Sequence, residues 1–191
     1  MEIRGLLFYA LGLFLVMVGC GQKKSMDEME SFKSHPFRLN TDSMAVMYPQ
    51  NAVSDEMEGI PSCYLVVYSD STVCNPCAVK ILYQWNALVV SLKERYGNEV
   101  KPCFIFSPKR EQVEEVKYAM EEVMIGFPVY IDTLYLTARN NPQLPANPMM
   151  HTFLVDKEGK VLLVGSPLKS MKMEKLMYDV LDKLLHSGYA K

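Results

Sequence analysis

The stretch from Tyr64-Leu-Val-Val-Tyr68 to Cys74-Asn-Pro-Cys77 joins a short apolar run to two cysteines that are separated by two residues. A continuous apolar run of this length, rich in residues that favour strands, is typical of a strand covered on both faces. After Cys77, apolar residues recur at three- and four-residue steps and predict one face of a helix that ends at Gly97. They are Ala78, Ile81, Leu82, Trp85, Leu88, Val89 and Leu92. The two cysteines are therefore expected where a buried strand passes into a long amphipathic helix.

The rest of the pattern predicts an α/β fold. Cys103-Phe-Ile-Phe106 is a second run of the buried-strand type, and two such strands joined by a helix form a parallel pair with a right-handed crossover. A helix, a strand, a hairpin and a last helix follow, at residues 109–124, 127–131, 152–156 with 160–164, and 168–187. The helix at 109–124 is predicted to face inward with Val113, Val116, Met120, Val123 and Met124. The helix at 168–187 is predicted to face inward with Met173, Leu176, Met177, Val180, Leu181 and Leu184. We expect a central mixed sheet, a parallel βαβ unit plus a C-terminal antiparallel hairpin, flanked by helices.

The position of the two cysteines indicates thiol–disulfide chemistry. A thiol at a helix N-terminus meets the positive end of the helix dipole and free backbone N–H groups, and both favour the thiolate that attacks disulfides. Pro76 is tolerated there because N–H groups of the first turn have no helical partner. The two-residue gap lets the sulfur of Cys77 reach a mixed disulfide formed by Cys74. A CxxC pair at a strand-to-helix junction inside a βαβ unit is a strong signal.

On these residues the sequence resembles the thioredoxin superfamily, in particular the membrane-tethered, extracytoplasmic thioredoxin-like proteins of the TlpA/ResA type. The resemblance covers residues 60–191 and rests on Cys74-Asn-Pro-Cys77, on the segment 127–132, and on the segment 152–161 with Gly165. It implies an oxidoreductase in which Cys74 attacks a disulfide and Cys77 resolves the mixed intermediate. The implied partners are protein or small-molecule disulfides and thiols, and no organic cofactor is implied beside the redox-active Cys74–Cys77 disulfide.

Three positions depart from the pattern of the family. Met150 stands where the family has a cis-proline opposite the CxxC pair, and Pro148 lies two residues earlier. Val73 replaces the aromatic residue that usually precedes the first cysteine. Tyr68 stands where the family has a buried acidic or amide residue that carries protons. Asp70 is the nearest carboxylate. We interpret it as a turn residue, in preference to a base that substitutes for the proton carrier of the family.

The start of the chain predicts export. Residues 1–19 contain Arg4 and an apolar run from Leu6 to Val18, whose 13 residues suit the core of a signal peptide better than a membrane span of about 20. The run ends at Val18-Gly19-Cys20, which resembles a bacterial lipoprotein signal and implies lipid attachment at Cys20. An uncleaved anchor helix, or a secretory signal that leaves Cys20 free, are the alternatives. We expect the mature protein in the bacterial cell envelope, anchored to the membrane with its domain in the periplasm.

Composition and length fit this organisation. The chain has 191 residues, 49% of them apolar and 22% charged, which excludes a disordered chain. The formal net charge of −2 provides no electrostatic attraction for nucleic acid, so no nucleic acid is expected as a partner. Residues 20–59 are expected to form a lipid-anchored tether with an edge strand or hairpin within 37–48. Residues 60–191 are expected to form the thioredoxin-like domain.

Other functions of the cysteines stay open at this point. Thiolates, thioethers and imidazole suit Cu(I), so Cys74, Cys77 and His151, with Met149 and Met150 beside the histidine, could bind copper in a chaperone. A zinc site is disfavoured, since a structural site needs four ligands. A non-catalytic binding module, or a closed structural disulfide in an exported chain, is a further alternative.

Two more cysteines, Cys63 and Cys103, fall on the two predicted parallel strands. We interpret them as small buried side chains, in preference to a disulfide with each other or extra resolving thiols.

Overall fold

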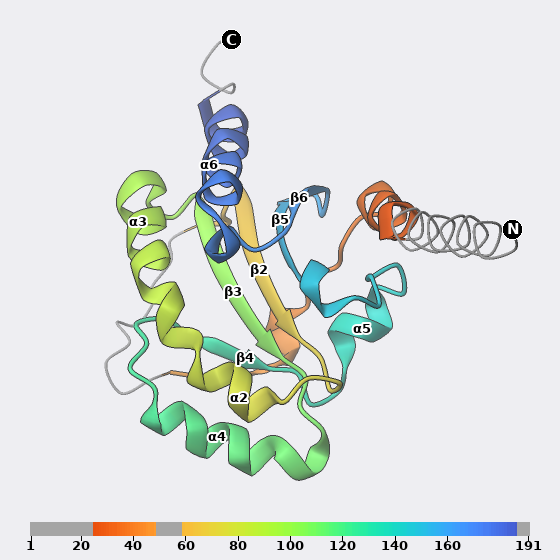
Figure 1. Ribbon diagram of the computed structural model, residues 1–191, viewed down its shortest axis with the longest axis vertical. Helices are drawn as coiled ribbons and strands as arrows, with labels where there is room; N and C mark the ends of the chain where they lie inside the picture. Colours follow the sequence, from red (N-terminus) through yellow and green to blue (C-terminus); the bar gives the residue numbers. More distant parts are fainter. Residues whose placement is uncertain (1–24, 49–58, 187–191) are drawn as a thin grey trace, which may run out of the picture.

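The structure, a computed structural model, describes residues 25–48 and 59–186 (Figure 1). The signal segment 1–19 and the lipid attachment expected at Cys20 lie outside the described residues. At the centre is a six-stranded sheet with the strand order β1-β4-β3-β2-β5-β6. Its strands are β1 (Ala45–Met47), β2 (Cys63–Ser69), β3 (Val100–Phe106), β4 (Val129–Ile131), β5 (Thr152–Asp156) and β6 (Val161–Val164). Strands β2, β3 and β4 are parallel, and β1, β5 and β6 run antiparallel to their neighbours.

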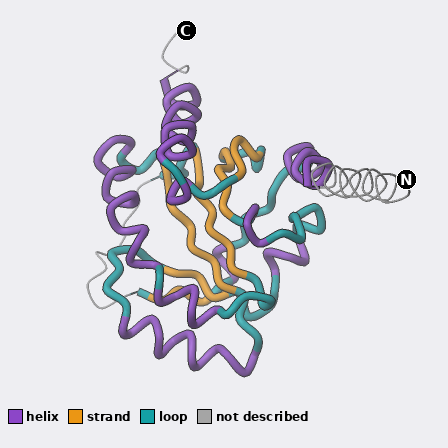
Figure 2. The backbone as a smooth tube through the Cα atoms, viewed as in Figure 1, coloured by secondary structure: helices purple, strands orange, loops and turns teal. Residues whose placement is uncertain are grey.

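Helices surround this sheet (Figure 2). The α-helices are α2 (Asn75–Lys80), α3 (Asn86–Tyr96), α4 (Val113–Glu122), α5 (Leu136–Asn140) and α6 (Met171–His186), and residues 25–34 are helical as well. Short 3₁₀ helices are η1 (Thr41–Ser43), η2 (Leu82–Trp85), η3 (Arg110–Gln112), η4 (Pro148–Met150) and η5 (Pro167–Lys169). Within the described ranges, no helix is both long enough and apolar enough to cross a membrane.

The order and direction of the elements confirm the expected fold class. A parallel unit runs from β2 through α2 and α3 to β3, and α4 carries the chain on to the parallel strand β4. The antiparallel pair β5–β6 joins the other side of β2, and α6 follows β6 and η5. This is the mixed sheet, flanked by helices, that the resemblance implies, so the chain has a thioredoxin-like fold.

The apolar core is divided between the two faces of the sheet. One face packs against α2, α3, α4 and α6 through side chains such as Trp85, Phe104 and Leu181. The opposite face packs against the segment before β1, where Phe32 and Phe37 are buried with Phe153. Because apolar side chains cover both faces, the central strands are apolar at nearly every position, as the sequence predicted.

The helix that follows the cysteines differs from the single long helix that was expected. It is interrupted after Lys80 by η2, and Ile81, predicted to face inward, is 53% exposed. The buried side chains of this stretch follow at three-residue steps, and they are Val79, Leu82, Trp85 and Leu88. A 3₁₀ helix has about three residues per turn, so these steps keep one face toward the sheet and turn Ile81 out.

Two other inward predictions are wrong. Met124 is 80% exposed because α4 ends at Glu122 and the chain continues extended at Val123. Leu176 is 43% exposed, since it lies one residue before the buried Met177 and is rotated about 100° from it around α6. The remaining predicted side chains that belong to the core or pack against it are Val116, Met120, Val123, Met177, Val180, Leu181 and Leu184. Val113 and Met173 are half-buried.

The segment before β2 is packed on the domain over part of the range expected as a tether. The ring centroids of Phe32 and Phe37 lie 5.0 and 4.8 Å from that of Phe153. The backbone N–H of Phe37 donates to the carbonyl of Gly159, 2.7 Å away. The following strand β1 pairs with β4 at the edge of the sheet, where an edge strand was expected. The folded part of the chain therefore includes residues before 60.

Candidate active site

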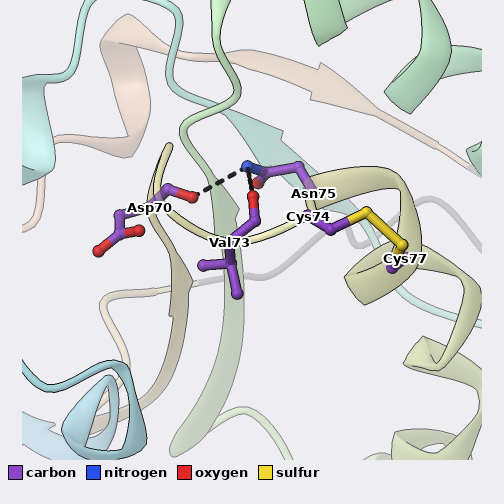
Figure 3. The surroundings of a disulfide bond; sticks show 5 residues. All are labelled: Asp70, Val73, Cys74, Asn75 and Cys77. Carbon is purple, nitrogen blue, oxygen red and sulfur yellow. Dashed lines mark hydrogen bonds between the residues drawn. A yellow bond between two sulfur atoms is a disulfide. The ribbon is translucent and has the colours of Figure 1, made fainter.

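Cys74 and Cys77 lie where β2 passes into α2, with Cys74 as the N-cap residue of the helix. They form a disulfide whose Cα atoms are 5.3 Å apart (Figure 3). Both residues are exposed, in contrast to their neighbours Asn75 and Pro76, which are buried. A visiting thiol or disulfide can therefore reach this sulfur pair from solvent.

Asn75 holds the turn that presents the two cysteines. Its side chain is 0% exposed, and its Nδ2 donates to the backbone oxygens of Asp70, at 2.9 Å, and Val73, at 3.2 Å. Figure 3 shows this side chain turned back toward Asp70 and Val73, away from the sulfur atoms. An amide can serve here because it supplies two N–H donors to two carbonyls. The residue between the cysteines thus fixes the strand-to-helix connection.

Asp70 initiates the same turn. Its Oδ1 accepts from the backbone N–H of Thr72 at 2.8 Å and from the Thr72 hydroxyl at 2.5 Å. This is the short-range side-chain-to-backbone bonding typical of aspartate in turns, and it confirms the turn role expected of Asp70. The carboxylate lies on the far side of the turn from the two sulfurs (Figure 3).

The helix start favours a thiolate on Cys74 once the disulfide is opened. An N-cap side chain accepts from the N–H of the second or third helical residue. In the disulfide form the Cys74 side chain makes no capping hydrogen bond. The second residue is Pro76, which has no N–H, so the N–H of Cys77 is the donor left for the Cys74 sulfur after the disulfide is opened. The carbonyl of Cys74 already accepts from Ala78 N at 2.9 Å, which anchors the first turn. The arrangement can stabilise negative charge on sulfur through local N–H dipoles.

The segment before β5 places Met150 and His151 near the start of that strand. Pro148 begins η4, and no peptide bond among the described residues is cis. His151 is 2% exposed; its Nε2 lies 2.7 Å from the Pro145 carbonyl and its Nδ1 lies 3.8 Å from Asp70 Oδ2. Both ring nitrogens therefore face the protein interior.

The structure does not assemble the copper ligands considered above. In the part of the chain that it describes, which includes Cys74, Cys77 and His151, no group of three or more His, Cys, Asp or Glu side chains could hold a metal ion. The exposed Met149 instead accepts a hydrogen bond from Lys169 Nζ at 3.5 Å.

Cys63 and Cys103 are not part of the site. Both are buried and free, which confirms their interpretation as small core side chains. Burial raises the pKa of each thiol to about 12, so neither supplies a thiolate near neutral pH.

Sequence reasoning did not anticipate the contact between Asp70 and His151. The two residues meet because β2 and β5 pair antiparallel, and the N–H of Tyr68 donates to the His151 carbonyl at 2.9 Å. The ring of Tyr68 lies 5.2 Å from that of His151, and burial is the main cause that raises the Tyr68 pKa. No spacing in the sequence signals this contact, because it depends on strand pairing.

Comparison with known proteins gives similarity at the level of solved structures. No family model and no curated protein matches the chain. A protein from Chlorobium tepidum assigned as a thiol:disulfide interchange protein, DsbE, is similar at 21% identity with a TM-score of 0.42, over 64% of this chain and 80% of that chain. A thioredoxin-like protein from Porphyromonas gingivalis is 15% identical with a TM-score of 0.46, over 78% and 94%. A thioredoxin-like protein from Bacteroides caccae is 11% identical with a TM-score of 0.47, over 85% and 56%.

Proposed function

We propose that this chain is a thiol–disulfide oxidoreductase that exchanges disulfides through Cys74 and Cys77. The observation that carries the proposal is an exposed, bonded CxxC pair at the start of a helix, directly after a buried strand. The helix start lowers the cost of a thiolate, and exposure lets a partner sulfur approach.

The atoms and electrons of the exchange balance with only the two cysteines and the disulfide or dithiol of the partner. In the reduced protein the Cys74 thiolate attacks a disulfide R–S–S–R′, forms a Cys74–S–S–R bond and expels R′–S⁻, which takes up a proton. Cys77 then loses its proton, attacks the Cys74 sulfur and expels R–S⁻, which is protonated in turn. The protein ends with the Cys74–Cys77 disulfide and the partner ends as two thiols. The reverse sequence oxidises a dithiol partner.

A purely structural disulfide is a weaker explanation of this pair. Cys74 and Cys77 are separated by only three positions in sequence, so their bond removes little conformational freedom from the unfolded chain. The neighbouring helices are already held by the core, in which Val79, Leu82 and Trp85 are buried. An exposed disulfide that adds little stability is better suited to being opened and closed.

We also propose that the protein acts in the bacterial cell envelope, attached to the membrane by lipid on Cys20. The sequence Val18-Gly19-Cys20 after an apolar run supports this, and an oxidising compartment permits the disulfide. The test is metabolic labelling with a fatty acid, which is expected to label the wild-type chain and not Cys20→Ala. Equal labelling of both chains would refute the attachment site.

The test of the exchange is a redox titration combined with trapping of the mixed disulfide. The wild-type chain is expected to show a reversible two-electron transition that is absent in Cys74→Ser. With a model disulfide, reduced Cys77→Ser should accumulate a mixed disulfide on Cys74, whereas Cys74→Ser should accumulate none. Cys63→Ala is the matched control, since its thiol is buried and exchange should be retained. Absence of any transition in the wild type, or trapping on Cys77 instead, would contradict the proposal.

A further inference from the structure

The imidazole of His151 is held in one tautomer by its surroundings. Its Nε2 is 2.7 Å from the carbonyl oxygen of Pro145, and a carbonyl only accepts, so Nε2 carries the proton. In the neutral ring, Nδ1 is then an unprotonated acceptor. Nδ1 is buried and has no hydrogen-bond partner among the described residues, and it faces Asp70 Oδ2 at 3.8 Å.

Nδ1 of His151 and Oδ2 of Asp70 would face each other with lone pairs, which repel. The contact is therefore attractive only when the two residues together hold one further proton. A proton on Nδ1 gives an imidazolium beside a carboxylate, and a proton on Asp70 gives a neutral donor to Nδ1. The acid that meets the ring directly is Asp70. Tyr68 packs on the ring at 5.2 Å, and Asp132 and Tyr135 lie beyond it, around Tyr68. The carboxylate of Asp132 is already occupied by the N–H groups of two residues of α5, Leu136 and Thr137.

Asp70 connects this pair to the cysteines. One carboxylate oxygen faces His151 while the other holds the turn through Thr72, and the Asp70 carbonyl accepts from Asn75 Nδ2. Asn75 stands between Cys74 and Cys77 in the first turn of α2. A change in how Asp70 is held is therefore transmitted to the turn that carries the two sulfurs.

We propose that Asp70 and His151 form a proton-sharing pair that positions the 70–75 turn and thereby couples proton uptake to opening of the Cys74–Cys77 disulfide. The pair acts as positioning residues, since the Asp70 carboxylate points away from the sulfurs (Figure 3). Such coupling is reciprocal: if proton uptake by the pair favours opening of the disulfide, opening of the disulfide must raise the proton affinity of the pair by the same factor. The proposal rests on the exchange function for its biological use, but the coupling itself is measurable without a substrate.

The test follows the three histidines of the full chain by ¹⁵N NMR across pH, in detergent, in the disulfide form and after reduction with dithiothreitol. His151 is expected to show the Nε2–H tautomer when neutral, and its affinity for a second proton should change by about fivefold or more between the two forms. His35 and His186, both exposed, should not change. Equal proton affinity of His151 in the two forms would overturn the proposal.

Two variants separate coupling from simple structural damage. His151→Gln keeps an N–H donor for the Pro145 carbonyl and cannot take a second proton, and Asp70→Asn keeps the oxygen that holds Thr72. The wild type is expected to show an extra inflection in its reduction potential against pH, and both variants are expected to lack it. His186→Gln, a matched change on the exposed surface, should leave the curve as in the wild type.

If the reduction potential of His151→Gln follows the same dependence on pH as that of the wild type, the coupling is contradicted. Coupling seen by NMR together with no exchange on any disulfide would refute the proposed function and leave the pair intact.

Discussion

Cys63 and Cys103 lie on adjacent parallel strands but on opposite faces of the sheet. In the β2–β3 register Cys63 pairs with Val100, and Cys103 pairs with Val66 three residues further along. Because side chains alternate between faces, an odd offset sends the two thiols in opposite directions. Cys63 packs under the helices and Cys103 packs beneath the N-terminal segment. Among the cysteines that the structure describes, Cys74 and Cys77 are the pair that can form and break a disulfide.

Alkylation of the reduced native protein should therefore discriminate between these cysteines. Cys74 and Cys77 are exposed. In Cys63 and Cys103, burial raises the thiol pKa to about 12, so that about one molecule in ten thousand carries the thiolate at pH 8. Iodoacetamide should modify the CxxC pair at least about 100-fold faster, as measured by mass spectrometry of the separate peptides. In guanidinium chloride all four should react alike. Rapid labelling of Cys63 in the native protein would contradict the structure.

The same burial predicts a loss of stability at alkaline pH. The folded chain holds the two thiols neutral up to about pH 12, while in the unfolded chain they ionise near their ordinary pKa. Their contribution is complete below that ordinary value and is lost as pH rises toward 12, at about 1.4 kcal/mol per pH unit for each thiol. Cys63→Ala or Cys103→Ala should make the free energy of unfolding fall less steeply in urea titrations between pH 8 and 11.

Val66→Ala is the control for this alkaline effect. It removes buried apolar volume next to Cys103 without removing an ionisable group, so it should lower stability by a similar amount at every pH. A slope in Cys103→Ala that equals the wild-type slope would show that its thiol is not held neutral by the fold.

Asn75 should be sensitive to loss of its N–H donors. Asn75→Asp keeps the shape of the side chain but turns a carboxylate toward the carbonyls of Asp70 and Val73, so it should lower the free energy of unfolding by about 2–3 kcal/mol. It should also shift the reduction potential of the Cys74–Cys77 pair. Asn86→Ala removes comparable hydrogen bonds around Met124 and Gly126, away from the cysteines, and should leave that potential unchanged. An unchanged potential in Asn75→Asp would remove Asn75 from the site.

Gly159 should tolerate no side chain. Its φ of +87° disfavours other residues, and a Cβ there would lie 2.6 Å from the carbonyl oxygen of Phe37. Gly159→Ala is expected to lower the free energy of unfolding by about 2–4 kcal/mol in denaturant titrations, because the backbone of the N-terminal segment must move. Gly126→Ala, with open space and no positive φ, should change stability by less than about 1 kcal/mol. Equal effects of the two changes would argue against the close contact.

Phe32 should be the main anchor of the N-terminal segment. Its ring is fully buried against Phe153. Phe32→Ala should therefore weaken the packing of this segment on the domain by about 3–4 kcal/mol. Trypsin cleavage after Lys33 and Arg38 should then become faster, as followed by mass spectrometry. Met26→Ala, at an exposed position of the same helix, is the control and should cleave like the wild type. Unchanged cleavage in Phe32→Ala would mean that the segment is held by other contacts.

The sequence by itself determined the elements that depend on near neighbours. The alternation and runs of apolar residues predicted β2, β3 and the β5–β6 hairpin, and the cysteine spacing at a strand-to-helix junction predicted the candidate site. These signals are local because burial on one or two faces imposes a period on the residues of a single element. The order of elements then restricted the fold to a mixed sheet with helical crossovers.

Only the tertiary structure decided the relationships between distant segments. The exposure of Ile81 follows from a 3₁₀ turn at η2, which no single residue marks. The packing of Phe32 on Phe153 and the contact of Asp70 with His151 join residues more than 80 positions apart. Such contacts are set by strand pairing and by the shape of the whole core, whose free energy is shared among many residues and leaves no local pattern in the chain.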